Sequence, residues 1–106
     1  MDINKYKIVF SPTSKKQFKK IYKYISNNLS EKNVALKLMK EIEDKVKLLE
    51  YAPHIHIKIG KKDSKNHEYR RLIVKNYIIL YIILEEKKKV RITHIFYNKS
   101  DYFNKL

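Results

Sequence analysis

Cysteine is absent from this 106-residue chain, which also contains only one glycine and two prolines. Without cysteine, neither a disulfide framework nor a thiolate metal site can form, which fits a reducing cytosol. The sequence has no glycine-rich phosphate loop, no Gly-x-Ser-x-Gly elbow and no His-Glu-x-x-His pair. We therefore expect no nucleotide hydrolysis, no esterase or zinc-protease chemistry, and no cofactor.

Long apolar segments are also missing. No apolar leader follows the first five residues, and the apolar run Tyr77–Leu84 is far shorter than the ~20 residues that span a bilayer. We expect a cytoplasmic protein that does not contact a membrane. A single domain is expected over residues 1–106, since a chain of this length can bury roughly 65% of its unfolded surface.

Acidic residues are scarce relative to basic ones. The chain contains 25 lysine and arginine residues against 11 aspartate and glutamate residues, giving a formal net charge of +14. Such a surface attracts polyanions, either nucleic acid through counterion release or an acidic protein. Because only Arg70, Arg71 and Arg91 are arginines, a general lysine bias of the source proteome is the alternative explanation.

The first half of the chain predicts one strand and two helices. Residues 5–10 alternate as a strand, and Ser11 with Pro12 predicts the N-cap and first position of a helix that ends near Asn28. Ser30 is expected to cap a second helix that ends near Glu50. The expected apolar stripes are Phe18, Ile21, Tyr22, Ile25 and Leu29 in the first helix, and Ala35, Leu38, Met39, Ile42, Val46 and Leu49 in the second.

The second half predicts a sheet. Residues 54–59 alternate strictly, and Gly60 then begins a polar loop through residue 66. Glu68–Val74, the wholly apolar Tyr77–Leu84 and residues 90–97 predict an antiparallel meander with Tyr77–Leu84 at its centre. The expected fold is α+β, with an N-terminal strand and a two-helix hairpin packed on one face of an antiparallel sheet. The other face is expected to be available for a ligand.

Histidines and tyrosines are the remaining candidates for chemistry. His54 and His56 share a predicted strand face, but without a third ligand we expect no metal site. His94 and Tyr97 are expected on opposite strand faces unless a bulge intervenes. The tyrosines of the C-terminal block suit stacking on unpaired bases, although strand propensity alone also selects tyrosine.

Several segments, taken in order, resemble the RelE/ParE toxins of type II toxin–antitoxin systems. These segments are the first strand with Phe10-Ser11-Pro12, the two amphipathic helices, Leu49 followed by Pro53, Tyr69-Arg70-Arg71-Leu72-Ile73-Val74, Asn76-Tyr77-Ile78-Ile79-Leu80-Tyr81, and Val90-x-Ile92-x-x-Ile95-x-Tyr97-x-Lys99-x-Asp101-Tyr102. Each motif is degenerate, so their order and spacing carry the resemblance, which covers nearly the whole chain.

The resemblance implies a small cytosolic toxin that a cognate acidic antitoxin neutralises by covering its surface. RelE-like members cut mRNA in the ribosomal A site, whereas ParE-like members poison DNA gyrase, and the shared fold does not separate the two. We expect ribosome-dependent mRNA cleavage, with the ribosome and mRNA as partners. Gyrase poisoning without catalysis is the alternative, and a non-toxic basic RNA-binding module is a third possibility.

RNA cleavage by a ribose 2′-hydroxyl requires removal of its proton, stabilisation of the phosphorane charge and protonation of the leaving 5′-oxygen. The basic C-terminal block supplies candidates for all three roles. The expected catalytic residues are Arg71, Lys75, Lys99 and Tyr102. The expected nucleic-acid-binding residues are Arg70, Lys61, Lys62 and Arg91.

Two positions depart from the RelE pattern that the resemblance implies. Ile73 occupies the position of a catalytic arginine four residues before Tyr77, and Lys99-Ser100 replaces paired arginines near the end. Arg71 lies on the same strand face as Ile73 and is the expected substitute. Because lysine lacks the fork of an arginine phosphate clamp, these departures weaken the nuclease interpretation and keep the gyrase alternative open.

Overall fold

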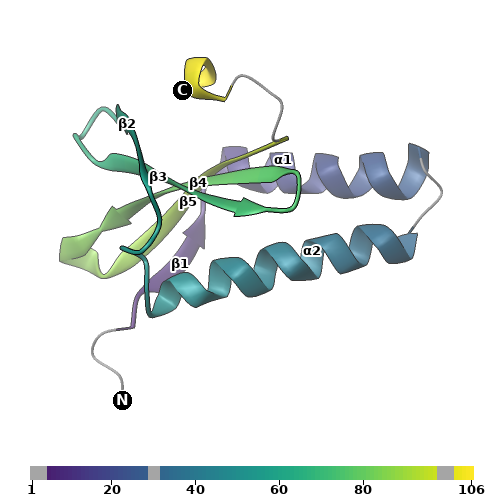
Figure 1. The fold of residues 1–106 in the computed structure, drawn as a ribbon, viewed down its shortest axis with the longest axis horizontal. Helices are drawn as coiled ribbons and strands as arrows, with labels where there is room; N and C mark the ends of the chain where they lie inside the picture. Colours follow the sequence, from purple (N-terminus) through teal and green to yellow (C-terminus); the bar gives the residue numbers. More distant parts are fainter. Residues whose placement is uncertain (1–4, 29–31, 98–101) are drawn as a thin grey trace.

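The computed structural model describes residues 5–28, 32–97 and 102–106, which form two helices packed against a five-stranded sheet (Figure 1). The helices and strands, in chain order, are β1 (Lys7–Phe10), α1 (Pro12–Lys23), α2 (Lys32–Lys47), β2 (Lys58–Lys62), β3 (Glu68–Val74), β4 (Tyr77–Leu84) and β5 (Lys89–Tyr97). Short 3-10 turns occupy Leu48–Glu50, Glu85–Lys87 and Phe103–Lys105. The α+β class predicted from the sequence is confirmed.

Helix α1 begins where the sequence predicts. Ser11 is extended, and its Oγ accepts a hydrogen bond from the backbone N–H of Ser14 at 3.1 Å, while Pro12 occupies the first helical position. The helix continues into a π-helical turn, Tyr24–Asn28, in which Ser26 Oγ donates to the Tyr22 carbonyl at 2.8 Å. The predicted N-cap and the predicted end near Asn28 are both confirmed.

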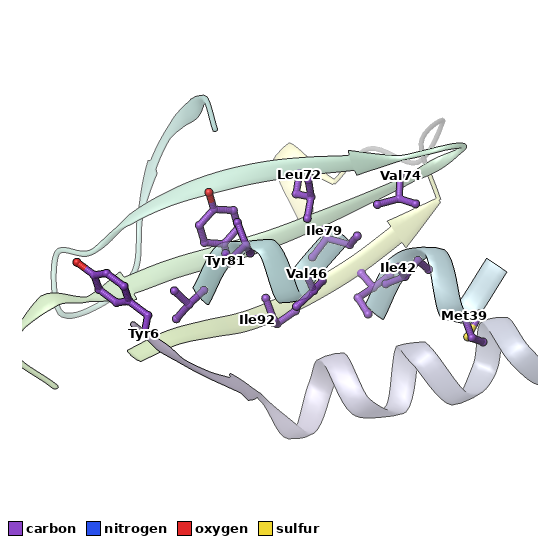
Figure 2. Packing of buried hydrophobic residues seen from close by; sticks show 12 residues of the cluster. Tyr6, Met39, Ile42, Val46, Leu72, Val74, Ile79, Tyr81 and Ile92 are labelled. Carbon is purple, nitrogen blue, oxygen red and sulfur yellow. The ribbon is translucent and has the colours of Figure 1, made fainter. Parts of the chain in front are cut away.

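The two helices form a hairpin on one side of the sheet (Figure 1). Their apolar stripes face the sheet. Ala35, Ile42 and Leu49, spaced seven residues apart, are completely buried. In Figure 2 the side chains of Ile42 and Val46 lie among core residues of β3, β4 and β5. The predicted stripes are confirmed, except that Leu29 and the expected cap Ser30 lie outside the described residues. None of the described helices is long and apolar enough to cross a membrane.

The sheet is mixed rather than purely antiparallel. Its strand order is β1-β5-β4-β3-β2, and the predicted meander of β3, β4 and β5 is antiparallel. Strand β1 pairs parallel to β5, from Lys7 beside Lys89 to Phe10 beside Ile92. The long connection through both helices and the meander allows this parallel pairing, which short turns cannot provide. Strand β4 lies at the centre, as predicted, and its residues 78–82 are buried.

The strand predicted for residues 54–59 is wrong over residues 54–57. Ile55 and Ile57 are 74% and 60% exposed, and regular pairing begins only at Lys58. The side chain of Arg70, from β3, replaces the backbone hydrogen bonds of a strand ladder here. Its Nη1 donates to the carbonyls of His54 and His56 at 3.0 and 2.7 Å. Because these carbonyls bond to a guanidinium instead of to a strand, the alternating sequence forms an irregular segment.

The loop predicted from Gly60 to residue 66 is also shorter than expected. Gly60, Lys61 and Lys62 belong to β2, and the irregular register between Lys58 and Lys62 accommodates the change. Gly60 has a φ of +81°, a conformation that L-residues with a Cβ rarely adopt. The single glycine of the chain therefore sits inside an edge strand at an irregularity of the ladder, not at the start of a loop.

Candidate functional site

The candidate site lies on the face of β3, β4 and β5 that is turned away from α1 and α2, here called the second face. Alternation along β3 sends Leu72 and Val74 into the helix-covered core, so Arg71 points to the second face. The C-terminal turn Phe103–Lys105 lies over this side of the sheet (Figure 1). The second face is therefore partly covered by the end of the chain itself.

Arg71 and Tyr102 meet on the second face. Arg71 Nη1 donates a hydrogen bond to Tyr102 Oη at 3.2 Å, across 31 positions of sequence. Both side chains are partly buried, which favours a fixed guanidinium orientation. The structure thus brings together two of the four residues predicted to be catalytic.

A β-bulge in β5 decides which side chains join them. Leu80 of β4 lies opposite His94, whereas the next residue, Tyr81, lies opposite Ile92, so Thr93 is an extra residue. Thr93 Oγ1 donates to the Leu80 carbonyl at 3.2 Å. The bulge leaves Ile92 and Ile95 in the core and turns His94 to the second face. Tyr97 lies three residues further along β5, on the opposite face from His94.

The first turns of α1 satisfy the backbone around this bulge. Ser11 Oγ donates to the Thr93 carbonyl at 2.9 Å, and Ser14 Oγ lies 3.0 Å from the Ile92 carbonyl. Gln17 Oε1 accepts the backbone N–H of Ile95 at 2.6 Å. The N-cap and two side chains of α1 therefore fix the irregular strand, together with the backbone N–H of Ser11, which donates to the Ile92 carbonyl at 2.9 Å.

An aromatic row runs across the second face beside Arg71. The rings of Tyr69 and His94 lie edge to face at 6.3 Å, and those of His94 and Phe96 stack at 5.3 Å with an interplanar angle of 12°. Cations flank the row from the chain end and from β2. Lys105 Nζ lies 5.8 Å from the Phe96 ring centre, and Lys61 Nζ lies 4.5 Å from that of Phe103.

Burial sets the charge of the two titratable rings in this row. Burial lowers the pKa of His94 below its usual 6.5, so the imidazole is neutral at neutral pH. Burial also raises the pKa of Tyr69, aided by Asp63 and opposed by Arg91. A neutral imidazole can accept a proton, and the nearby guanidinium can stabilise an anion. The second face therefore carries groups suited to binding a phosphate.

The remaining predicted site residues take several positions. Lys75, in the β3–β4 turn at a φ of 51°, pairs with Glu41 of α2 at 3.6 Å. Arg70 points to the helix side of β3 and holds the carbonyls of residues 54 and 56. Lys62 is exposed at the end of β2, opposite Glu68. Arg91 is exposed and points to the second face, because Val90 and Ile92 on either side of it lie in the core, and it lines a surface hollow with Asp63 and His67. Lys99 lies outside the described residues.

Three residues on the second face, Phe96, Phe103 and Lys105, were not predicted from the sequence. His94 and Tyr69 were predicted only as general candidates for chemistry. The bulge that turns His94 and Phe96 outward has no local sequence signal. The contacts of the C-terminal turn join residues far apart in the chain. The one sequence signal that could have indicated these residues is that the phenylalanines lie close in sequence to basic residues of the C-terminal block.

The two histidines considered as metal ligands have other contacts. His54 Nε2 pairs with Glu85 Oε1, and His56 lies edge to face with Tyr81 at 6.2 Å. Burial lowers the pKa of His56, with Arg70 and Lys45 adding to the effect. Within residues 5–28, 32–97 and 102–106, no three His, Asp or Glu side chains gather in a way that could hold a metal ion.

Comparison with known proteins relates the chain to bacterial and archaeal toxins. The family described as "ParE toxin of type II toxin-antitoxin system, parDE" matches residues 8–102. A chain of the chromosomal ParDE system of P. aeruginosa is similar at a TM-score of 0.70 and 16% identity, covering 89% of this chain and 97% of that chain. A chain of the archaeal RelE–RelB complex from Pyrococcus horikoshii OT3 is similar at a TM-score of 0.62 and 13% identity, covering 90% and 97%. No curated protein matches in sequence.

Proposed function

Because the chain belongs to the ParE toxin family of type II toxin–antitoxin systems, we propose that it arrests growth by poisoning DNA gyrase and that a cognate antitoxin neutralises it. The match to the ParE family over residues 8–102 favours this target over the ribosome. Gyrase poisoning is a binding activity, so it requires a complementary surface but no catalytic group on the toxin.

The placement of the basic residues predicted for the site supports gyrase over the ribosome as the target. A ribonuclease must gather a base, an acid and a charge-stabilising group around one phosphate. Among the described candidates, Lys75 is paired with Glu41 and Arg70 donates to loop carbonyls, so neither faces Arg71 and Tyr102. Ile73, where the RelE pattern has an arginine, is 49% exposed and carries no charge.

The second face has the character of an antitoxin-binding surface. It combines cations, Arg71, Lys61 and Lys105, with the rings of Phe96 and Phe103. An acidic, partly apolar antitoxin segment laid over this face would neutralise the charges and cover the rings. This partner fits the net charge of +14, because burying so many cations without counter-charges is unfavourable.

A second candidate function is ribosome-dependent mRNA cleavage. The hydrogen bond between Arg71 and Tyr102 favours it, since a guanidinium held in place can stabilise a phosphorane. Neutral His94 on the same face would then remove the 2′-hydroxyl proton, and Tyr102 would protonate the leaving oxygen. This assignment replaces Lys75, whose ion pair holds it on the helix side of the sheet.

One experiment separates the two targets. Wild-type protein and the Arg71→Ala/Lys99→Ala variant are each expressed from a tightly controlled promoter in cells lacking the antitoxin. Gyrase poisoning predicts growth arrest with accumulating DNA breaks and intact mRNA, and purified protein should stabilise cleaved DNA–gyrase complexes. Wild-type arrest with A-site mRNA cuts that disappear in the variant would establish the nuclease instead. Harmless expression of the wild type would contradict both.

A further inference from the structure

The two helices carry equal numbers of lysines but very different numbers of acids. Helix α1 contains five lysines and no aspartate or glutamate, whereas α2 contains five lysines and three acidic residues. Both helices belong to the same lysine-rich chain, so a general lysine bias predicts the same mixture in each. The charge of α1 therefore requires a separate explanation.

The lysines of α1 form one continuous exposed face. They follow each other at intervals of one and three residues, which places them on the same side of a helix with 3.6 residues per turn. All five are exposed, and the opposite side, with Ser14, Phe18 and Ile21, packs toward the core and β5. This lysine face of α1 consists of Lys15, Lys16, Lys19, Lys20 and Lys23.

Nothing in the described part of the chain neutralises the lysine face. The ion pairs among residues 5–28, 32–97 and 102–106 involve other lysines, such as Lys40 with Asp44 at 3.5 Å on α2. Three pairs on α1, beginning with Lys15 and Lys19, place like charges four residues apart, which destabilises a helix. The first turn also lacks the acidic residue that the helix dipole favours. Lys20 and Lys23 lie in the last turn, where the dipole favours a cation, but local helix stability does not account for Lys15, Lys16 and Lys19.

We propose that the lysine face of α1 binds the phosphate backbone of nucleic acid without reading its sequence. From Lys15 to Lys23 the face extends about 12 Å along the helix axis, enough to contact several consecutive phosphates. Its five side chains include no arginine for bidentate base recognition and no ring, so the contacts that they make are point charges against phosphates. The site is separate from the second face, because α1 packs on the other side of the sheet.

A nucleic acid fits this face better than an acidic protein. Protein interfaces are depleted in lysine and have an apolar or aromatic centre. On this side of α1 the lysines form the centre, and the aromatic hollow that Lys20 lines with Tyr24 and Tyr97 lies at one edge. A polyanion with regularly spaced charges gains affinity from counterion release and needs no apolar contact. The inference does not depend on gyrase or the ribosome as the target of the toxin.

The test compares two variants with the same loss of charge. In one, all five lysines of the lysine face are changed to glutamine. In the matched control, the five lysines of α2 are changed in the same way. The control positions are Lys32, Lys37, Lys40, Lys45 and Lys47. Full-length wild type and both variants are titrated against fluorescent 25-base-pair DNA and RNA duplexes over a series of salt concentrations, using fluorescence anisotropy.

The α1 variant should bind at least about tenfold more weakly at low salt. The slope of log K against log salt concentration should become less negative by up to about 4. The α2 control should stay within about twofold of the wild type. Equal losses of affinity in both variants would show that binding depends only on the total charge of the protein, which would overturn the proposal. Wild type that binds poly-glutamate but neither duplex would also overturn it. Similar affinity for DNA and RNA supports backbone binding, and a preference identifies the natural polymer.

Loss of folding is controlled in two ways. Glutamine and lysine have similar helix propensities, and the change removes like-charge pairs, so the α1 variant should keep the helical circular dichroism of the wild type and unfold at no lower a midpoint. A third variant changes the same five lysines to arginine, which preserves the charge. It should retain the affinity and salt dependence of the wild type, and failure to do so would contradict binding through charge alone.

Discussion

The hydroxyl of Tyr81, at the centre of the sheet, donates a 2.7 Å hydrogen bond to the carbonyl of Pro53. Tyr81 is completely buried, and burial raises its pKa, opposed only by Arg70, so the phenol stays protonated as a donor. The bond ties the irregular segment after α2 to β4. One buried donor thus holds a segment whose sequence predicts a strand.

Changing Tyr81 to phenylalanine should lower the free energy of unfolding by about 1–3 kcal/mol, because the buried Pro53 carbonyl loses its donor. Urea denaturation followed by circular dichroism measures the change. Tyr24→Phe is the matched control, since Tyr24 is 60% exposed, and its effect should stay within about 0.5 kcal/mol. Equal effects of the two changes would show that the Pro53 contact contributes little.

Arg70→Ala should destabilise the protein more than Arg91→Ala. Arg70 donates to two backbone carbonyls, those of His54 and His56, whereas Arg91 is exposed on β5. We expect a loss of about 1–3 kcal/mol for Arg70→Ala and less than about 0.5 kcal/mol for Arg91→Ala. Hydrogen exchange should accelerate at residues 54–58 only in the Arg70 variant. Unchanged exchange there would contradict a structural role for Arg70.

Ser14→Ala should weaken the junction between α1 and the bulge. Ser14 is completely buried, and its Oγ lies within hydrogen-bonding distance of the carbonyls of Ser11 and Ile92. Loss of the hydroxyl should cost about 1–2 kcal/mol in thermal or urea unfolding. Thr13→Ala, at an exposed position of the same turn, is the control and should be nearly neutral. A neutral Ser14→Ala would mean that the Ser14 hydroxyl does not stabilise the bulge.

The stability should depend on pH through His56 and His94. Burial lowers the pKa of both below the usual 6.5 in the folded state, so the unfolded chain binds protons first as the pH falls. The folded state, which holds both histidines neutral, keeps its full stability above pH ~6.5, and its free energy of unfolding decreases below that pH. Unfolding free energies measured between pH 7.5 and 5.5 should show this decrease. The His94→Phe variant should show a smaller slope, and an unchanged slope would exclude His94 as a contributor.

Local chemistry predicted much of the fold. The cap at Ser11, the apolar stripes of both helices and the meander of β3, β4 and β5 each depend on residues within a few positions of one another. Alternation along β3 also placed Arg71 on the same strand face as Ile73, opposite to the buried Leu72 and Val74. Arg71 and Tyr102 were predicted to belong to one site, but their hydrogen bond is seen only in the structure.

The sequence by itself determined the elements whose hydrogen bonds and apolar periods are local, together with the excess of positive charge. The tertiary structure decided the parallel pairing of β1 with β5, the irregular segment at residues 54–57, the outward turn of His94 and the attachment of Lys75 to Glu41. Each of these depends on a partner distant in the chain, which supplies a donor, an acceptor or an opposite charge. A local pattern contains no information about such partners, because they become neighbours only when the chain has folded.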